Sequence, residues 1–222
     1  MTNLSVTFYS KIYTEFKTIE GNEHLSIVRF YESYKENIPH LNFSEYFELL
    51  ICYSNALFEI GAYQSHVKVV DIAIQASIIN NIKFYNGQDI YTELLFKKAA
   101  SCYNLMEYDQ TEHILRELTK ITPYNEMVQR FLKKCLLRKK PAYLTNARGL
   151  AILLLLATAF VIAIELIFVR TMMTTYISIF EMMRNTTFIA SLLLIAGSAI
   201  LHRAQIYFWV KQFVTECKMR KG

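Results

Sequence analysis

The chain has 222 residues, a formal net charge of +5 and an apolar fraction of 53%. Its length allows one ordinary domain and a smaller second part, while the apolar fraction is too high for a chain that is soluble throughout. Charge is also uneven, because residues 1–129 hold 10 Lys and Arg against 16 Asp and Glu, and residues 130–222 hold 14 against 3. The sequence therefore predicts an acidic soluble part followed by a basic, membrane-associated part.

Residues 1–140 show the periodicity of helices and little strand alternation. The clearest pair of helices resembles a tetratricopeptide repeat. The resemblance rests on a large residue, a small residue, an aromatic that opens the second helix, two inner leucines and a final proline: Leu95, Ala99, Tyr108, Leu115, Leu118 and Pro123. A small residue lets two antiparallel helices approach each other, and proline cannot continue a helix.

A second match spans Leu50–Ile78, where Gly61 supplies the turn and Tyr63 the aromatic that follows it. Gly61 and the corresponding Met106 are 45 residues apart, more than the 34 residues typical of the family. We therefore expect long helices or an inserted linker at residues 80–89. The resemblance implies an antiparallel helical solenoid whose concave face binds a protein segment.

Two apolar windows follow the helical part. The first contains Glu165 as its only charged residue and is long enough to cross about 30 Å of hydrocarbon. The second ends in aromatic residues, as membrane-spanning helices do at an interface. We therefore expect an all-α chain that ends in a two-helix transmembrane hairpin. The predicted order is a helical domain at 1–140, a basic segment at 141–148, transmembrane helices at 149–169 and 185–210 with a loop at 170–184 between them, and a basic tail at 211–222.

Positive charge indicates how the hairpin is oriented. We expect the basic residues before the first span to contact lipid headgroups: Lys133, Lys134, Arg138, Lys139, Lys140 and Arg148. By the positive-inside rule both termini lie in the cytoplasm and the protein is a multi-pass inner (plasma) membrane protein. The first residues lack a basic segment followed by an apolar one, so we expect no cleaved signal.

Glu165 lies about one helical turn from the predicted outer end of the first span. One interpretation is that it reaches the outer interface or pairs there with Arg170 or Arg184. The other treats an ionisable residue inside the membrane as functional, with Thr158 beside it in a polar seam of an oligomer. His202 and Arg203 would then lie at the opposite, cytoplasmic mouth. Small residues would permit close contact of helices between hairpins: Ala159, Ala163 and Gly197.

No motif indicates catalysis. The five histidines form no metal-binding pattern, the four cysteines match no metal spacing, and there is no Gly-rich phosphate loop. We expect no enzyme activity, cofactor or metal, although a membrane hydrolase with dispersed catalytic residues stays an alternative. Direct binding of nucleic acid is not expected, because the acidic soluble part repels phosphate.

The architecture resembles the two-transmembrane effectors of bacterial antiphage systems, including those paired with retrons. This resemblance implies a hairpin that perturbs the inner membrane, and a protein or ribonucleoprotein partner, a reverse transcriptase with its RNA–DNA product, at the cytoplasmic domain. The alternative is a constitutive membrane-anchored adaptor whose helical repeats recruit a protein complex.

Overall fold

The computed structural model of the chain describes residues 11–139, 141–169 and 177–221. Nearly all of the regular structure in these residues is helical, which confirms the predicted all-α class. The chain divides into two compact units, residues 1–135 and residues 136–222.

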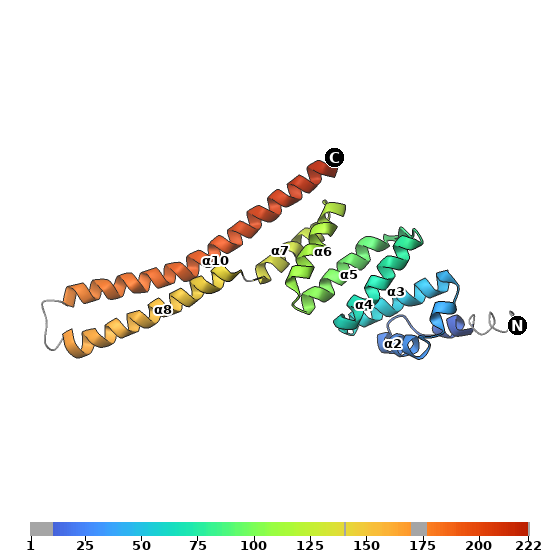
Figure 1. Cartoon of the computed structure of the whole chain (residues 1–222), viewed down its shortest axis with the longest axis horizontal. Coiled ribbons are helices and arrows are strands. Elements are labelled where there is room, and N and C mark those ends of the chain that lie inside the picture. The colour runs from blue at the N-terminus through green and yellow to red at the C-terminus, as the bar shows by residue number, and fades with distance from the viewer. Residues whose placement is uncertain (1–10, 140, 170–176, 222) are drawn as a thin grey trace. The chain divides into compact units, whose positions relative to one another are not determined.

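The first unit is a row of helices in which each helix from α2 to α6 contacts the next (Figure 1). Residues 11–16 form a helical turn before them. Segments of three to ten residues connect the helices, and successive helices from α3 to α6 run in opposite directions. The elements are α2 (His24–Ser33), η1 (Ile38–His40), α3 (Phe43–Glu59), α4 (Tyr63–Ile79), α5 (Ile90–Asn104), α6 (Tyr108–Ile121) and α7 (Glu126–Arg138).

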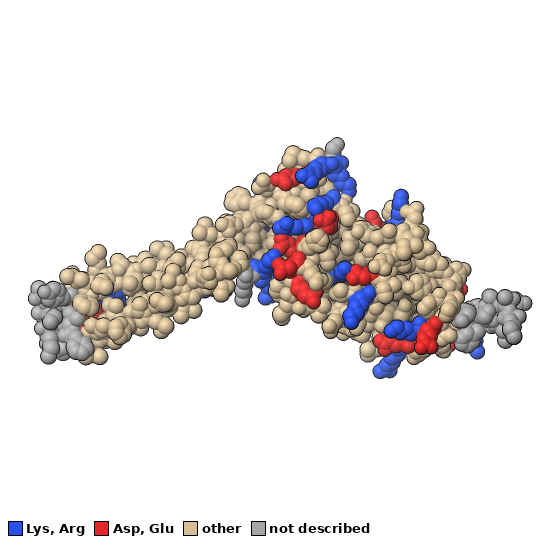
Figure 2. Space-filling view, viewed as in Figure 1, with Lys and Arg blue, Asp and Glu red and all other residues tan. Residues whose placement is uncertain are grey.

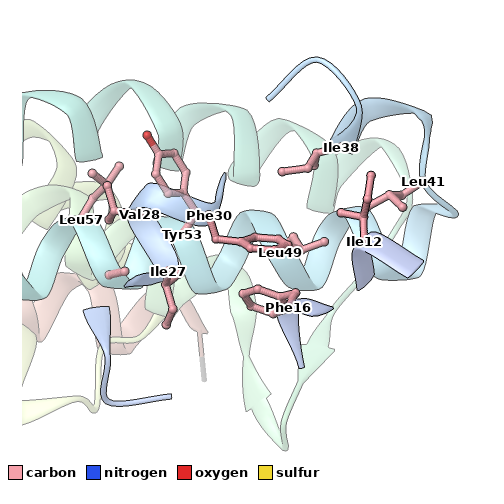
Figure 3. Packing of buried hydrophobic residues seen from close by; sticks show 11 residues of the cluster. Ile12, Phe16, Ile27, Val28, Phe30, Ile38, Leu41, Leu49, Tyr53 and Leu57 are labelled. Carbon is pink, nitrogen blue, oxygen red and sulfur yellow. The ribbon is translucent and has the colours of Figure 1, made fainter. Parts of the chain in front are cut away.

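Buried apolar side chains hold this row together in two clusters. The first cluster joins residues 11–16 to α2 and α3, and Ile12 and Phe16 point into it (Figure 3). The second lies between α3, α4 and α5 and contains Val70 and Leu94. Full burial of such side chains contributes about 1.5–3 kcal/mol each. The row is therefore stabilised by contacts between successive helices.

An ion pair fastens the N-terminal turn to α3. The Tyr13 hydroxyl donates to the Glu48 carboxylate over 2.6 Å, and the Lys17 ammonium pairs with the same carboxylate. Burial favours a higher pKa for Glu48, but the hydrogen bonds from Lys17 and Tyr13 outweigh burial and lower the pKa. The N-terminal turn thus covers one stretch of α3 with its own side chains.

The turns after α3 and α5 have the same geometry. Gly61 has φ +78° and Met106 has φ +63°, and the two residues are 45 positions apart in the sequence. In both turns the next residue donates its N–H to the carbonyl five residues before it over 2.9 Å, the bond that closes a helix on a left-handed residue. The two predicted repeat turns are therefore structurally equivalent.

Side chains around the first turn have counterparts around the second turn, 45 residues later in the sequence. Phe58 meets Tyr63 at 5.9 Å between ring centroids and an interplanar angle of 69°, and Tyr103 meets Tyr108 at 5.5 Å and 69°. Three pairs of buried residues show the same offset: His66 and Thr111, Val70 and Leu115, and Ala73 and Leu118. The α3–α4 and α5–α6 pairs are thus two copies of one helical hairpin.

The repeat-defining residues occupy the following positions. Ala99, Leu115 and Leu118 are buried, and Tyr108 begins α6. Pro123 follows the last residue of α6 by two positions. Leu95 is only half-buried, and its neighbour Leu94 fills the core instead. Neighbouring side chains on a helix point about 100° apart. The buried face of α5 therefore begins at Leu94, one residue earlier than the repeat spacing predicted.

A small β-hairpin occupies the segment that we expected to be an inserted linker. Strands β1 (Phe84–Tyr85) and β2 (Gln88–Asp89) pair in antiparallel register. Asn86 and Gly87 have φ values of +50° and +79°, which the two-residue turn of such a hairpin requires. The dipeptide Asn-Gly was the local signal for this hairpin.

The second unit consists of two long apolar helices that run side by side in opposite directions (Figure 1). They are α8 (Ala142–Ile164), which continues into the π-helical segment η2 (Glu165–Val169), and α10 (Ile177–Lys221). Both are long and apolar enough to cross a membrane.

The helices extend beyond the segments predicted for the two spans. α8 begins inside the basic segment 141–148, and α10 begins inside the expected loop 170–184 and continues through the expected tail 211–222. The reason is that residues 177–184 and 211–221 contain neither proline nor glycine, so nothing in the sequence ends the helix. An apolar window marks the segment that can lie in lipid, whereas helix-breaking residues set the ends of the helix.

Candidate functional site in the apolar hairpin

Buried polar side chains of the hairpin lie on the faces where α8 and α10 meet. On the first helix, Leu144, Ala151, Thr158 and Glu165 are spaced by seven residues and are at most 4% exposed. A seven-residue spacing is close to two helical turns and places these residues on one face. Glu165 and Thr158 thus face the second helix of the same hairpin.

Glu165 pairs with Arg184 across the hairpin. The distance between Arg184 Nη1 and Glu165 Oε2 is 2.9 Å, and the Glu165 side chain is 1% exposed whereas that of Arg184 is 29% exposed. Glu165 is also the first residue of the π-helical segment, a local irregularity that often occurs at functional sites. Of the two arginines proposed as partners, Arg184 makes this contact, and Arg170 lies outside the described residues.

One further polar contact joins the middle of the two helices. The Thr158 and Thr187 hydroxyl oxygens lie 3.1 Å apart, and each hydroxyl also bonds a carbonyl four residues earlier in its own helix. Ser191 is fully buried and bonds the carbonyl of Phe188. A hydrogen bond to a carbonyl of its own helix satisfies a hydroxyl group where water is absent. The hairpin therefore carries hydroxyls along its seam with their hydrogen bonds made.

A third polar cluster lies at the predicted cytoplasmic end of the hairpin. The Tyr143 hydroxyl lies 2.8 Å from His202 Nδ1 and donates to Gln205 Oε1 over 3.1 Å. His202 is 9% exposed, and its Nε2 is buried without a hydrogen-bond partner. Arg203, predicted beside His202 at this end, is exposed. Glu165 and His202 therefore belong to separate polar contacts at opposite ends of the hairpin.

The outer surface of the hairpin is mostly apolar between Gly149 and Leu201. Figure 2 shows Lys, Arg, Asp and Glu on the helical domain and on the C-terminal end of α10, and few along the visible side of the part where α8 and α10 run side by side. Ala159 and Ala163 are exposed on this outer side, and a methyl group on Gly197 would meet no atom within 4 Å. The predicted helix-packing residues on α8 thus face away from α10.

The basic residues predicted to contact lipid headgroups are largely exposed. Arg138, Lys139 and Arg148 are exposed, and Lys133 is half-buried. Lys134 lies over the ring of Tyr103, 5.3 Å from its centroid, a contact that attracts a cation to an aromatic face. Lys140 lies outside the described residues.

A buried histidine and serine form a second polar pair, in the helical domain. His66 Nδ1 of α4 lies 2.7 Å from the Ser101 hydroxyl of α5, and both residues are 0% exposed. Burial, together with the nearby charge of Lys97, lowers the pKa of His66 to about 4. The pair resembles a nucleophile and its base in distance, but no substrate reaches two side chains that are fully enclosed. We interpret it as a link between the two helical hairpins.

Three of the seam residues were not among the residues predicted for the site. Thr187 contacts the predicted Thr158, Tyr143 contacts the predicted His202, and Gln205 contacts Tyr143. Nothing in the sequence distinguishes these three from other polar residues. Their contacts all follow from one antiparallel register of α8 and α10. Within the described residues, no group of three or more His, Cys, Asp and Glu side chains is placed to hold a metal ion.

Comparison with protein-family models, curated proteins and solved structures gives no match to this chain.

Proposed function

We propose that this chain is a non-catalytic effector of the inner membrane. Its cytoplasmic helical domain binds a partner, and its two apolar helices span the membrane and perturb it when the partner no longer restrains them. The resemblance in architecture to the two-transmembrane effectors of antiphage systems supports this proposal. It also suggests the partner, a protein or ribonucleoprotein such as a reverse transcriptase with its RNA–DNA product.

The observation that carries the proposal is the buried ion pair of Glu165 and Arg184. A membrane anchor needs only apolar side chains, and a buried ion pair is often no more stable than apolar residues of the same volume. Ionisable residues inside membrane segments are therefore rare and commonly functional. While the pair is closed, each charge neutralises the other; opening the pair would place two charges against lipid and disturb it.

Partner binding is supported by apolar side chains that remain exposed on the helical domain. Ile72 and Ile79 lie two turns apart on one face of α4 and are 48% and 80% exposed, and Phe84 in the β-hairpin is 70% exposed. Exposed apolar patches on a soluble domain commonly mark interaction sites. The repeated hairpins α3–α4 and α5–α6 provide a rigid support of the kind that tetratricopeptide-like domains use to bind protein segments.

The second candidate is a constitutive membrane-anchored adaptor, and a specific observation favours it. The contacts of Glu165 and Thr158 are made within one hairpin, and large apolar residues such as Leu156 and Phe160, each 67% exposed, cover the outer face. Such a hairpin needs no oligomer to satisfy the side chains of Glu165 and Thr158 in lipid. In this reading the helical domain alone carries the function.

Expression of the intact chain by itself in bacteria separates the two candidates. Membrane insertion would be measured by carbonate extraction, and membrane potential by a voltage-sensitive dye, for the wild type and Glu165→Ala. Phe160→Leu, on the outer face of the same helix, is the matched control. The effector predicts loss of potential with the wild type and the control, and normal potential with inserted Glu165→Ala. Normal potential in all three inserted proteins at every expression level would instead support the adaptor.

A further inference from the structure

The outward side of α4 carries an apolar side chain where its copy in the second helical hairpin carries a charge. Ile72 of α4 is 48% exposed. Its counterpart 45 residues later is Glu117 of α6, whose side chain is 46% exposed and pairs with Lys120 over 2.6 Å. The two positions are thus about equally open to solvent, and the repeated fold accepts a charged residue there. Packing within the helical domain therefore does not require an apolar residue at Ile72.

Exposed apolar side chains continue along the same side of α4. Four exposed residues recur at spacings of four, three and four positions, which places them on one side of a helix: Lys68, Ile72, Gln75 and Ile79. We call these four residues the α4 face. Ile79 is 80% exposed, and the β-hairpin that follows α4 adds Phe84, which is 70% exposed. Apolar side chains exposed on successive turns mark an interaction site.

The α4 face is basic, although it belongs to an acidic domain. Residues 1–129 hold 10 Lys and Arg against 16 Asp and Glu, a balance of −6. Lys68 is exposed and forms no ion pair with another residue that the structure describes, since the sole acid of α4, Asp71, pairs with Lys98 over 2.6 Å. Lys83, directly before Phe84, is a second exposed cation. A ligand with acidic side chains beside apolar ones would therefore complement this surface.

Two other occupants fit the α4 face less well. A two-fold dimer through this face would bring Lys68 of both copies into one interface, and the face of neither copy contains an acid to neutralise it. The anionic surface of the inner leaflet attracts basic segments, but it would repel a domain that carries six more acids than bases. A segment of another protein meets neither objection.

We propose that the α4 face is the docking site for the partner, and that the partner supplies an amphipathic protein helix with apolar side chains two turns apart and acidic side chains beside them. This inference rests on the proposed function, which requires a partner at the helical domain. Ile72 and Ile79 are themselves two turns apart, so they would meet the apolar side chains of a helix that lies along α4. A ribonucleoprotein partner would likewise be bound through its protein, because the acidic domain repels phosphate.

Binding of a synthetic peptide to the full chain in nanodiscs of zwitterionic lipid tests the docking. The probe is a helical peptide with leucines at heptad spacing and glutamates beside them, and the control peptide carries lysines in place of the glutamates. Affinity would be measured by fluorescence anisotropy of the labelled peptides. We expect the wild type to bind the acidic peptide more tightly than the basic one.

Two matched variants locate the bound peptide. Ile72→Glu introduces the residue that α6 holds at the same position, so we expect it to fold, and it should weaken binding of the acidic peptide on the order of tenfold or more, because it removes an apolar contact and repels the glutamates. Leu25→Glu changes an aliphatic residue of the same size on α2, 59% exposed, and should leave the affinity within about twofold of the wild type. Lys68→Glu, which changes charge alone, should reduce the preference for the acidic peptide.

The docking is overturned if the wild type binds the acidic peptide no more tightly than the basic one, or if Leu25→Glu weakens binding as much as Ile72→Glu. Self-association of the wild type in detergent that Ile72→Glu abolishes would assign the face to a second copy instead. Slower amide hydrogen exchange of residues 72–84 in nanodiscs than in detergent, without peptide, would assign it to lipid. Peptide binding needs no membrane activity, so a hairpin that is inactive in cells would refute the effector function alone, whereas an active hairpin with no binding of the acidic peptide would refute the docking alone.

Discussion

Removal of the arginine from the buried ion pair is the sharpest test of the hairpin. Arg184→Met keeps most of the side-chain volume and leaves the Glu165 carboxylate, which is 1% exposed, without the cation 2.9 Å away. A buried carboxylate that loses a cation at this distance is less stable than the intact pair. We therefore expect a large loss of hairpin stability from this one substitution.

The magnitude follows from what each substitution leaves behind. Loss of one partner of a buried pair costs about 3–5 kcal/mol, and a charge in the middle of a membrane helix costs about 2.5–3.5 kcal/mol on insertion scales. Because Arg184 keeps 29% of its side chain exposed, we expect the low end, about 3 kcal/mol. The double variant Glu165→Leu with Arg184→Met leaves no charge, and should be within about 1 kcal/mol of the wild type or more stable.

Tryptophan fluorescence provides the assay, since Trp209 on α10 is the sole tryptophan of the chain. Unfolding of the full chain by SDS in mixed micelles would be followed at this residue for the wild type, both single variants and the double variant. The four values form a double-mutant cycle with an expected coupling of at least about 2 kcal/mol between the two sites. A coupling near zero, or a double variant as unstable as Arg184→Met, would refute the reasoning.

Three further outcomes are expected in the helical domain, each measured by urea unfolding of the full chain followed by circular dichroism. Met106→Gly should stabilise it by about 0.5–1 kcal/mol, because relief of a left-handed φ (about 1–2 kcal/mol) exceeds the flexibility that glycine adds (about 0.5–1 kcal/mol). Gly61→Ala should destabilise it by a similar amount at the equivalent turn, and an equal sign for both would contradict their equivalence. The pKa of His66 falls from 6.5 to about 4 on folding, so protonation of this residue favours the unfolded chain. The free energy of unfolding should therefore be constant above pH 6.5, decrease between pH 6.5 and 4, and level off below about pH 4 after a loss of about 3 kcal/mol. A His66→Gln variant should lack this part of the pH dependence.

Local features of the chain determined most of the fold. Short stretches of sequence predict the repeated turn at Gly61 and Met106, the proline after α6 and the two apolar windows. They do so because periodicity and backbone preference are local properties. The same local rules missed the extension of α10, since an apolar window ends where lysines begin, whereas a helix ends only where a residue breaks it. The β-hairpin at 84–89 was missed although Asn86 and Gly87 are a strong turn signal.

The contacts of the candidate site depended on tertiary structure. The sequence by itself identified Glu165 and Thr158 and offered two arginines as partners for Glu165, but the rotation and register of two helices decide which side chains meet. Only the packing of α8 against α10 places Arg184 on Glu165 and Thr187 on Thr158, and turns Ala159 and Ala163 outward. A helix pattern marks an apolar face, but the element packed against that face decides what covers it.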